Sequence, residues 1–392
     1  MFQKIMPFLA DETHGQSYKA HKYNLDNAER PAFDYDGKET TWRNLAETEI
    51  RRGYTNLAER CKQLSENEDQ IISFFLDGSR RVFKVDDIAY SIDGKRKQIF
   101  PVIAGQIGVG CCRRINKQMH CERFLSEIVL AVPEIACASG SGQEGFFRSL
   151  ATKISQNCAE LQRRGLSVSA IYPYSIKDDG KKREDKGTSK VQDRMIILEQ
   201  EMVAQLVREH RLGQNGYLIK DGSLEYLPEY SPDKQKYKRN KQNYRWVLGL
   251  SKQFNAELCH DEKGKVNPGF IAELPPFSRT PVAKYDCSKQ SNSMLGDIQF
   301  AVWYIRLRDK NRTRSPFDGV LKVEKILVTD DEIAYGMDSE LVDTLSAYLI
   351  NERTPTSYGA DLRWANHIYP IYLTELYVKS QYISTPSFLQ LF

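Results

Sequence analysis

The tripeptide Asp-Gly-Ser occurs twice in this chain, each time at the end of an apolar run: IISFFLDGS (71–79) and GYLIKDGS (216–223). A short apolar run followed by Gly is typical of a buried β-strand. We expect each strand to end at its aspartate, where a rigid backbone holds the carboxylate and Gly-Ser lets the chain turn close to a phosphate or metal. Asp-Gly alone is an ordinary turn dipeptide. The shared context predicts one site built from Asp77 and Asp221.

The composition fits a protein with a substantial core. The chain has 392 residues, of which 41% are hydrophobic and 28% charged, so one elaborated domain or two would be possible. No apolar run approaches the roughly 18 to 20 residues of a membrane span, and the N-terminus lacks the features of a secretory signal. The eight cysteines show no disulfide rhythm, which favours reduced thiols. We therefore expect a cytoplasmic protein with no membrane partner.

Two basic segments, 177–190 and 233–246, interrupt a chain whose net charge is only +4. Cations beside aromatic rings suit single-stranded nucleic acid, because the cations neutralise phosphates and the rings stack on bases. A solvated surface loop is the alternative interpretation of either segment. The second segment supplies these candidate nucleic-acid contacts: Lys236, Lys238, Arg239, Tyr244 and Arg245.

The order of expected elements divides the chain at about residue 70. Residues 1–70 would form an N-terminal arm and a helix over 40–64 capped by Thr41, used for docking or dimerisation. Residues 71–392 would form the second unit, with a basic insertion at about 225–245. It would begin with strands at 71–77, 81–93 and 95–105, joined by a turn at Asp93-Gly94. Helical spacing from 122 to 164, a strand at 166–175 and a helix at 190–211 would follow.

Glu199 lies within the apolar stripe of the last of these helices, between Met195 and Met202. An ionised carboxylate is costly to bury unless it is paired or bound to metal. Glu199 is therefore a better site candidate than its neighbour Glu201, although the spacing permits both.

The expected elements follow a fixed order along the chain: a strand that carries an aspartate, two further strands, a helix that carries a glutamate, and a strand that carries the second aspartate. This is the order of a ribonuclease H-like core, which is a mixed central sheet flanked by helices. The chain resembles the NurA nucleases, on FFLDGSRR with Asp77 and LIKDGSLEYL with Asp221. Glu199 is similar to the family's helical glutamate, and Lys252 in RWVLGLSKQF to its lysine after a strand. Segments 301–307 and 315–326 resemble the late strands, with Glu324 in a Lys-Val-Glu element.

The C-terminal segment HIYPIYLTELYVKSQYI (367–383) resembles the family's Tyr-Pro element before the last helix. The family pattern has a histidine eight residues after the tyrosine, whereas counting from Tyr369 reaches Tyr377. Tyrosine is a poorer ligand for a hard divalent ion than a carboxylate, so Glu375 could take over that role. The catalytic candidates at this end are therefore Tyr369, Glu375 and Tyr377.

The resemblance implies phosphodiester hydrolysis with two divalent ions, Mn²⁺ or Mg²⁺, held by Asp77, Glu199 and Asp221. Arg80 and Arg81 would hold phosphate or lie on the surface. The resemblance also implies a homodimer docked on a hexameric HerA-type ATPase, acting on DNA in repair or antiphage defence. Docking through 1–35 or the tail 387–392 is a hypothesis based on their apolar residues. A catalytically weak DNA-guiding subunit and a purely structural interaction protein are the alternatives.

Two other patterns in the sequence do not predict a ligand site. The segment CCRRINKQMHC (111–121) fits no common zinc spacing, and Cys111 and Cys112 are expected in a buried strand or turn. GQIGVG (105–110) and GSGQEG (140–145) lack the Lys-Ser/Thr ending of a phosphate-binding loop and are interpreted as turns.

Overall fold

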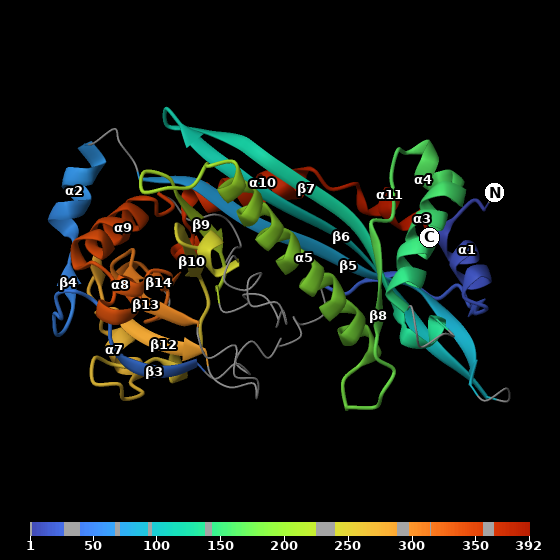
Figure 1. The fold of residues 1–392 in the computed structure, drawn as a ribbon, viewed down its shortest axis with the longest axis horizontal. Helices are drawn as coiled ribbons and strands as arrows, with labels where there is room; N and C mark the ends of the chain where they lie inside the picture. Colours follow the sequence, from blue (N-terminus) through green and yellow to red (C-terminus); the bar gives the residue numbers. More distant parts are fainter. Residues whose placement is uncertain are drawn as a thin grey trace.

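The computed structural model describes residues 2–26, 40–66, 71–92, 96–137, 143–224, 240–287, 298–313, 315–355 and 364–392. Its centre is one mixed β-sheet with helices on both faces (Figure 1). Three long strands form an antiparallel ribbon that joins the two ends of an elongated molecule. The structure is therefore a mixed α/β fold, as expected from the sequence.

The sheet runs in the order β3-β12-β13-β14-β10-β9-β5-β6-β7-β8. Strand β9 is parallel to both β5 and β10, while β5, β6 and β7 are antiparallel neighbours. Four two-residue strands, β1, β2, β4 and β11, lie off this path. The bounds are β1 Gln16–Ser17, β2 Tyr23–Asn24, β3 Thr40–Leu45, β4 Thr55–Asn56, β5 Ile72–Ile92, β6 Arg96–Ile115, β7 Gln118–Pro133, β8 Ala170–Tyr174, β9 Tyr217–Asp221, β10 Val247–Ser251, β11 Ser278–Arg279, β12 Ala283–Cys287, β13 Gln299–Arg306 and β14 Val320–Ile326.

The helices divide between the two faces. Helix α5 packs on one face of the ribbon and α10 on the other, and α5 crosses the ribbon obliquely in the view of Figure 1. The bounds are α1 Ile5–Glu12, α2 Ala58–Glu66, α3 Gln143–Asn157, α4 Ala159–Arg163, α5 Arg183–Arg208, α7 Pro268–Ala272, α8 Asp330–Tyr335, α9 Ser339–Asn351, α10 Tyr369–Ser380 and α11 Thr385–Leu389.

Glycines on β6 set how closely the two helices approach the ribbon. A Cβ on Gly105 would lie 2.5 Å from Val191 of α5, and a Cβ on Gly110 would lie 2.6 Å from Val378 of α10. Since side chains alternate between the faces of a strand, odd residues of β6 face α5 and even residues face α10. The GQIGVG segment is thus the middle of a strand, and the expectation of a turn there was wrong. The glycines give backbone room to helices on both faces.

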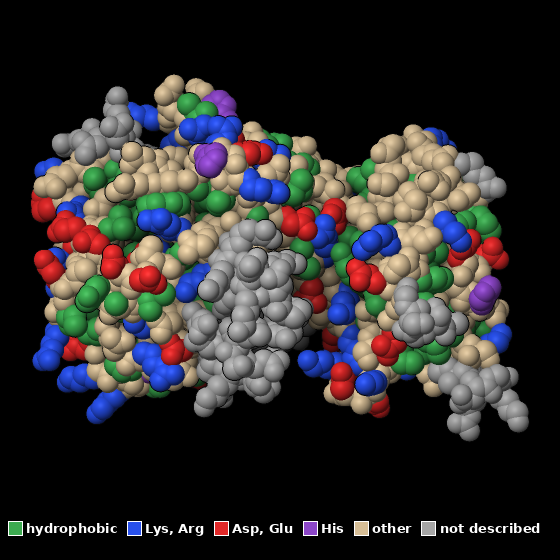
Figure 2. All heavy atoms as spheres, in the orientation of Figure 1, with side chains coloured by type: hydrophobic (Ala, Val, Ile, Leu, Met, Phe, Trp, Pro, Cys, Tyr) green, Lys and Arg blue, Asp and Glu red, His purple; other side chains and the backbone are tan. Residues whose placement is uncertain are grey.

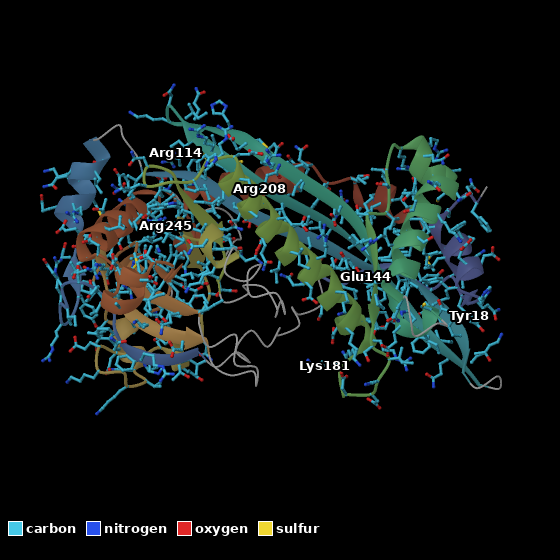
Figure 3. All side chains as sticks on the ribbon, viewed as in Figure 1. Tyr18, Arg114, Glu144, Lys181, Arg208 and Arg245 are labelled. Carbon is cyan, nitrogen blue, oxygen red and sulfur yellow. The ribbon has the colours of Figure 1, made fainter. Side chains whose placement is uncertain are left out.

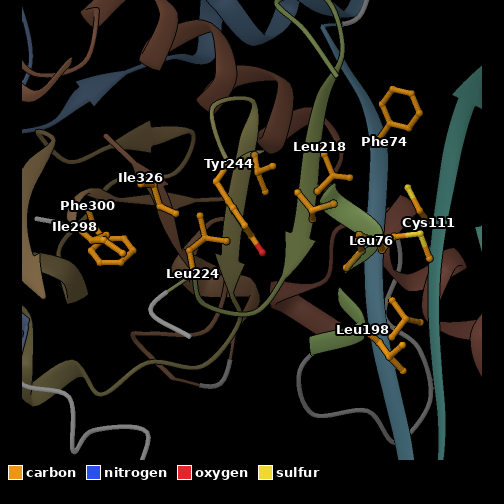
Figure 4. Packing of buried hydrophobic residues seen from close by; sticks show 14 of the residues in the cluster. Phe74, Leu76, Cys111, Leu198, Leu218, Leu224, Tyr244, Ile298, Phe300 and Ile326 are labelled. Atoms are coloured by element: carbon orange, nitrogen blue, oxygen red, sulfur yellow. The ribbon is translucent and has the colours of Figure 1, made fainter. Parts of the chain in front are cut away.

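Buried apolar residues form three clusters, and β5 contributes to all of them. The α5 face contains Leu76 with Leu198 and Leu218 (Figure 4). The opposite face contains one cluster around Phe83 and α1, α3 and α11, and another around Phe75, α2 and α9. The segment of β5 between Phe75 and Phe83 therefore joins two cores on the α10 face.

The helix expected over 40–64 is not present. Residues 40–45 form β3, which pairs with β12, and a helix begins only at Ala58. The cause lies far away in the sequence: Glu47 is buried and pairs with the fully buried Arg279 on β11, with Nη2 2.9 Å from a carboxylate oxygen. A carboxylate held this way cannot lie on the solvent side of a surface helix.

Helical spacing also misled the prediction for 122–133, which belongs to strand β7. Later in the same range, α3 and α4 are helical as expected. The strand near 170 and the helix containing Glu199 are confirmed as β8 and α5. Helix α5 begins at Arg183, so half of the basic segment 177–190 is helical and not a loop.

The two ends of the chain pack together. Ile5 and Leu9 of α1 share a cluster with Phe388 and Leu391, and all four are fully buried. These apolar residues of the segments that suggested docking are therefore covered within the chain itself. Strands β1 and β2 pair with β5, and β3 pairs with β12, so the described part of residues 1–70 interleaves with the main sheet. The boundary at residue 70 stays a prediction.

Within the described ranges, no helix is both long enough and apolar enough to cross a membrane.

Candidate functional site

The candidate site lies where β9 ends and β5 continues. Strand β9 pairs with β5 only as far as Leu76 and Lys220. Strand β2 pairs with the same edge of β5 from Phe83 onward, so no strand covers that edge just beyond Asp77. A cleft of about 420 Å³ opens there, between α5 and the ends of β9 and β10. Asp77, Glu199 and Asp221 all line it. The structure thus brings together the three carboxylates that the sequence singled out.

Asp77 and Asp221 reach the cleft from the α10 face. They follow a register pair on neighbouring parallel strands, so their carboxyl groups lie side by side and share a hydrogen bond. Lys252, just after β10, places its Nζ 2.9 Å from Asp221 Oδ2. Glu375 of α10 lies near enough for its charge to act on Asp77. This group, which we call the aspartate cluster, contains Asp77, Asp221, Lys252 and Glu375.

The two aspartates differ in protonation. Burial raises the pKa of Asp77 well above its ordinary value, and the charge of Asp221 raises it further. Burial also acts to raise the pKa of Asp221, but the charge of Lys252 outweighs it and holds that pKa below the ordinary value. Like charges in a shared buried site do not both ionise readily. Of the two aspartates, Asp77 is therefore the one that holds a proton more readily, because its pKa is raised and that of Asp221 is lowered.

Glu199 reaches the cleft from the opposite face. A Cβ on Gly78 would lie 2.3 Å from Glu199 Oε1, and since neighbouring residues of a strand point to opposite faces, Glu199 and Asp77 lie on different sides of β5. Lys220 holds Glu199, with Nζ 2.9 Å from Oε2, and also donates to the Asp221 carbonyl oxygen at 3.0 Å. Burial raises the pKa of Glu199, while Lys220 opposes that rise.

The second Asp-Gly-Ser is a turn, whereas the first is not. Gly222 has a φ of 90°, which favours glycine, and its amide donates to the Leu250 carbonyl oxygen at 2.7 Å. The buried carboxylate of Glu324 then accepts from Ser223 Oγ at 2.8 Å and from the Leu224 amide at 2.7 Å. The first copy continues through β5, with Gly78 paired to Val109. The expectation that the strand ends at Asp77 was therefore wrong, and it ends only at Ile92.

A divalent metal fits part of this donor set. The carboxyl oxygens of Asp77 and Asp221 are the donors that a hard cation prefers, and the charge of the cation would favour ionisation of both groups. Glu199, however, is held by Lys220 on the other side of β5. No group of three His, Cys, Asp or Glu side chains in the described parts of the chain is arranged to hold a metal ion. Asp77 and Asp221 are thus the pair best suited to a metal, with Glu375 on their face.

The C-terminal candidates separate along α10. Glu375 forms a 2.5 Å ion pair with Lys379, and the charges of Lys252 and Asp221 act on it. Tyr377 instead contacts β7: its ring lies 5.9 Å from Phe124, and it shares a hydrogen bond with Cys121. Tyr369 lines a different pocket, with Arg114 and Glu352. Of the three, Glu375 is placed to serve the cluster.

Most of the residues expected to contact DNA instead contact other side chains of the protein. Arg81 lies between the rings of Tyr382 and Phe388 and donates to Gln106 Oε1 at 2.6 Å. Tyr244 is 3% exposed within the α5-face core, so its ring has no free face for a base (Figure 4). Arg80 pairs with Asp26 at 2.6 Å.

Arg245 (Figure 3) stacks over the Trp246 ring at 4.9 Å. Lys236, Lys238 and Arg239 lie outside the described residues. On the face drawn in Figure 2, basic and acidic side chains are interspersed. That face shows no broad field of one sign among its coloured residues.

Lys220, which holds Glu199, was not expected from the sequence. A signal was present, because a lysine inside the apolar run YLIKD is unusual for a buried strand. Lys220 is only 8% exposed, and its ammonium is paired with Glu199.

The fold and the site define a mixed α/β protein with a cleft that holds paired aspartates and lysine-bound carboxylates. No protein-family model matches the chain, and no curated protein does. Among solved structures, the crystal structure of the NurA nuclease from Sulfolobus solfataricus is similar. The two are 12% identical with a TM-score of 0.41, over 85% of this chain and 89% of that one.

Proposed function

We propose that the chain is a metal-dependent DNA nuclease with a ribonuclease H-like core. The observation that carries the proposal is the meeting of Asp77 and Asp221, which are 144 residues apart, on adjacent parallel strands at one cleft. The strand order β7-β6-β5-β9-β10, with α5 between β7 and β9, supports that core. The sequence resemblance to NurA nucleases rests on these same two aspartates.

Asp77 and Asp221 would hold the metal, with Glu375 from the same face and Glu199 across the edge of β5. A divalent ion, Mn²⁺ or Mg²⁺, supplies an activated water and neutralises charge on the phosphate. Lys252 fixes the Asp221 carboxylate by an ion pair, and Lys220 fixes Glu199. Bonds of this kind preorganise acidic side chains before a substrate arrives.

A catalytically weak DNA-guiding subunit of the same fold is the second candidate. The observation that favours it is that lysines already neutralise Asp221 and Glu199, which leaves less negative charge to attract a cation. The resemblance further implies a homodimer and a HerA-type hexameric ATPase as partner, in DNA repair or antiphage defence. These partners, like a cytoplasmic location, rest on the sequence.

The test is cleavage of end-labelled linear single- and double-stranded DNA with Mn²⁺ or Mg²⁺, with and without a HerA-type ATPase. We expect Asp77→Asn and Asp221→Asn to lose at least about 100-fold in rate, as removal of a catalytic electrostatic group does. Glu201→Gln is the matched control: Glu201 lies on the same helix as Glu199, is exposed, and pairs with Arg194. Its rate should stay within about twofold of wild type.

Direct titration of Mn²⁺ separates the two candidates. A nuclease should bind Mn²⁺ in the wild type and lose that binding in Asp77→Asn. A protein that binds DNA but neither cleaves it nor binds Mn²⁺ would be the guiding subunit. Full metal-dependent cleavage by Asp77→Asn would overturn the proposed site.

A further inference from the structure

Two cysteines face each other across the β6–β7 ladder. Cys112 and Cys121 are register partners on these antiparallel strands, next to a bulge at Glu122 of β7. Directly opposite residues have Cβ atoms about 4.5 to 5.5 Å apart, and a disulfide requires about 3.5 to 4.5 Å. A small closing movement of the two strands would therefore bring the sulfur atoms within bonding distance.

The neighbouring Cys111 cannot take part in the same way. Adjacent residues of a strand point to opposite faces, and Cys111 belongs to the core on the α5 face, beside Leu76 (Figure 4). Cys112 lies on the α10 face. Cys121 is exposed, whereas Cys111 and Cys112 are buried. An oxidant in solution therefore reaches Cys121 first.

Both facing thiols contact helix α10. Cys112 shares a hydrogen bond with Thr374, and Cys121 shares one with Tyr377. Glu375 of the aspartate cluster follows Thr374 directly. The cysteine pair thus contacts the helix face next to the residue that α10 contributes to the cleft.

We propose that Cys112 and Cys121 form a reversible disulfide that loosens α10 from the sheet. Hydrogen peroxide would oxidise the Cys121 thiol to a sulfenic acid, breaking the O–O bond and releasing one water. The Cys112 sulfur then attacks the sulfenic sulfur, the S–S bond forms, and hydroxide leaves as a second water. The balance is two thiols and one peroxide giving one disulfide and two waters.

The predicted effect on α10 follows from the lost thiol hydrogen of Cys112 and from the closing of the strands. Thr374 Oγ1 already donates to the Pro370 carbonyl oxygen at 2.9 Å, so its bond with Cys112 needs the thiol hydrogen. A disulfide sulfur carries no hydrogen, and α10 therefore loses this side-chain contact to the ribbon. A bond that draws opposite strands together stores strain, and strained disulfides are the readily reduced ones. A dithiol should therefore restore the reduced form.

Mass spectrometry tests the bond. The full chain is treated with peroxide, blocked with an alkylating agent and digested with trypsin, without reduction. We expect peptides 98–113 and 118–123 joined, with the loss of two hydrogen atoms. Because the first peptide also contains Cys111, the variants decide the partner: Cys111→Ala should keep the link, and Cys112→Ala should lose it. A link that persists in Cys112→Ala, or Cys121 oxidised without any link, would overturn the proposal.

Hydrogen exchange tests the effect on the helix without reference to catalysis. Amides of residues 369–380 should exchange at least about tenfold faster after oxidation, return to the original rate with a dithiol, and stay unchanged in peroxide-treated Cys112→Ala. Equal exchange in a wild-type protein shown to carry the disulfide would overturn the coupling to α10.

Discussion

Each acidic group of the cleft is held by a different neighbour, and those neighbours decide its protonation. The charge of Lys252 lowers the pKa of Asp221, whereas burial and the charge of Asp221 raise the pKa of Asp77. The two aspartates look alike in sequence, since each precedes Gly-Ser. Their difference arises from which strand brings a lysine to which oxygen.

Replacing Asp77 by Asn should stabilise the metal-free protein at neutral pH. A group whose pKa is raised on folding contributes stability at low pH and loses it as the pH rises through the folded-state pKa. A rise of one pKa unit corresponds to about 1.4 kcal/mol, and Asn carries no such penalty. Denaturant unfolding in EDTA should be measured at a series of pH values. The free energy of unfolding of the variant, relative to that of wild type, should increase as the pH rises.

Asp11→Asn, at an exposed position of α1, is the control. The difference in unfolding free energy between this variant and wild type should stay small at every pH. If Asp77→Asn is instead less stable than wild type throughout, the proton does not lie on Asp77.

Gly78→Ala should be costly although it adds one methyl group to a strand. The new Cβ would meet Glu199 Oε1 at 2.3 Å, and overpacking of this kind costs about 1 to 3 kcal/mol. Gly145→Ala is the matched control, because nothing lies within 4 Å of its Cβ position near the start of α3 and alanine favours a helix. Chemical denaturation should separate the two variants, and equal stability would contradict the close contact.

At the scale of elements, the two copies of Asp-Gly-Ser show what a sequence can and cannot predict. The second copy ends β9 with a glycine turn at Gly222, as its local chemistry indicates. The first copy stays in β5 because β6 pairs with it past Gly78. The residues near Asp77 in the sequence do not predict this pairing. Local patterns thus predicted the strand, the aspartates and helix α5.

What local patterns could not supply was the placement of side chains relative to the sheet. Glu199 was correctly expected to be buried, but its position across β5 from Asp77 depends on register. The same limit explains the missing helix at 40–64, where β12 and Arg279 lie more than 200 residues away. The role of Glu199, Glu375 and Lys252 in catalysis stays a prediction.

The packing of α10 on β6 should behave as a complementary pair. Gly110→Ala alone should destabilise by about 1 to 3 kcal/mol, because its Cβ would lie 2.6 Å from Val378 Cγ2. Val378→Ala removes that methyl group and should recover part of the loss in the double variant. A double-mutant cycle on unfolding free energies should give a coupling of about 0.5 to 3 kcal/mol; additive effects would mean that the two residues do not touch.

At the scale of the whole molecule, the ends of the chain act as one structural unit. Phe388 of α11 stacks near Phe83 of β5, with ring centroids 5.4 Å apart, and shares a core with Leu9 of α1. The first and last helices of the chain therefore close one core together.

Phe388→Ala should consequently destabilise the protein by about 3 to 5 kcal/mol, as large-to-small changes of a buried aromatic do. Tyr335→Ala is the control, because that ring is 72% exposed and should cost little. Thermal unfolding would show the difference. A Phe388→Ala protein as stable as wild type would contradict the burial of the C-terminal segment.

The ribbon of β5 and β6 has a consequence for how the cleft can admit a large molecule. Strand β5 runs beneath the cleft from the core around Phe75 to the core around Phe83, and β6 pairs with it along this whole stretch. The ribbon therefore has no break at the cleft about which two halves could swing. A large molecule would then enter and leave the cleft by movement of the helices that border the site. The ribbon would keep its conformation and hold Asp77 in a fixed position.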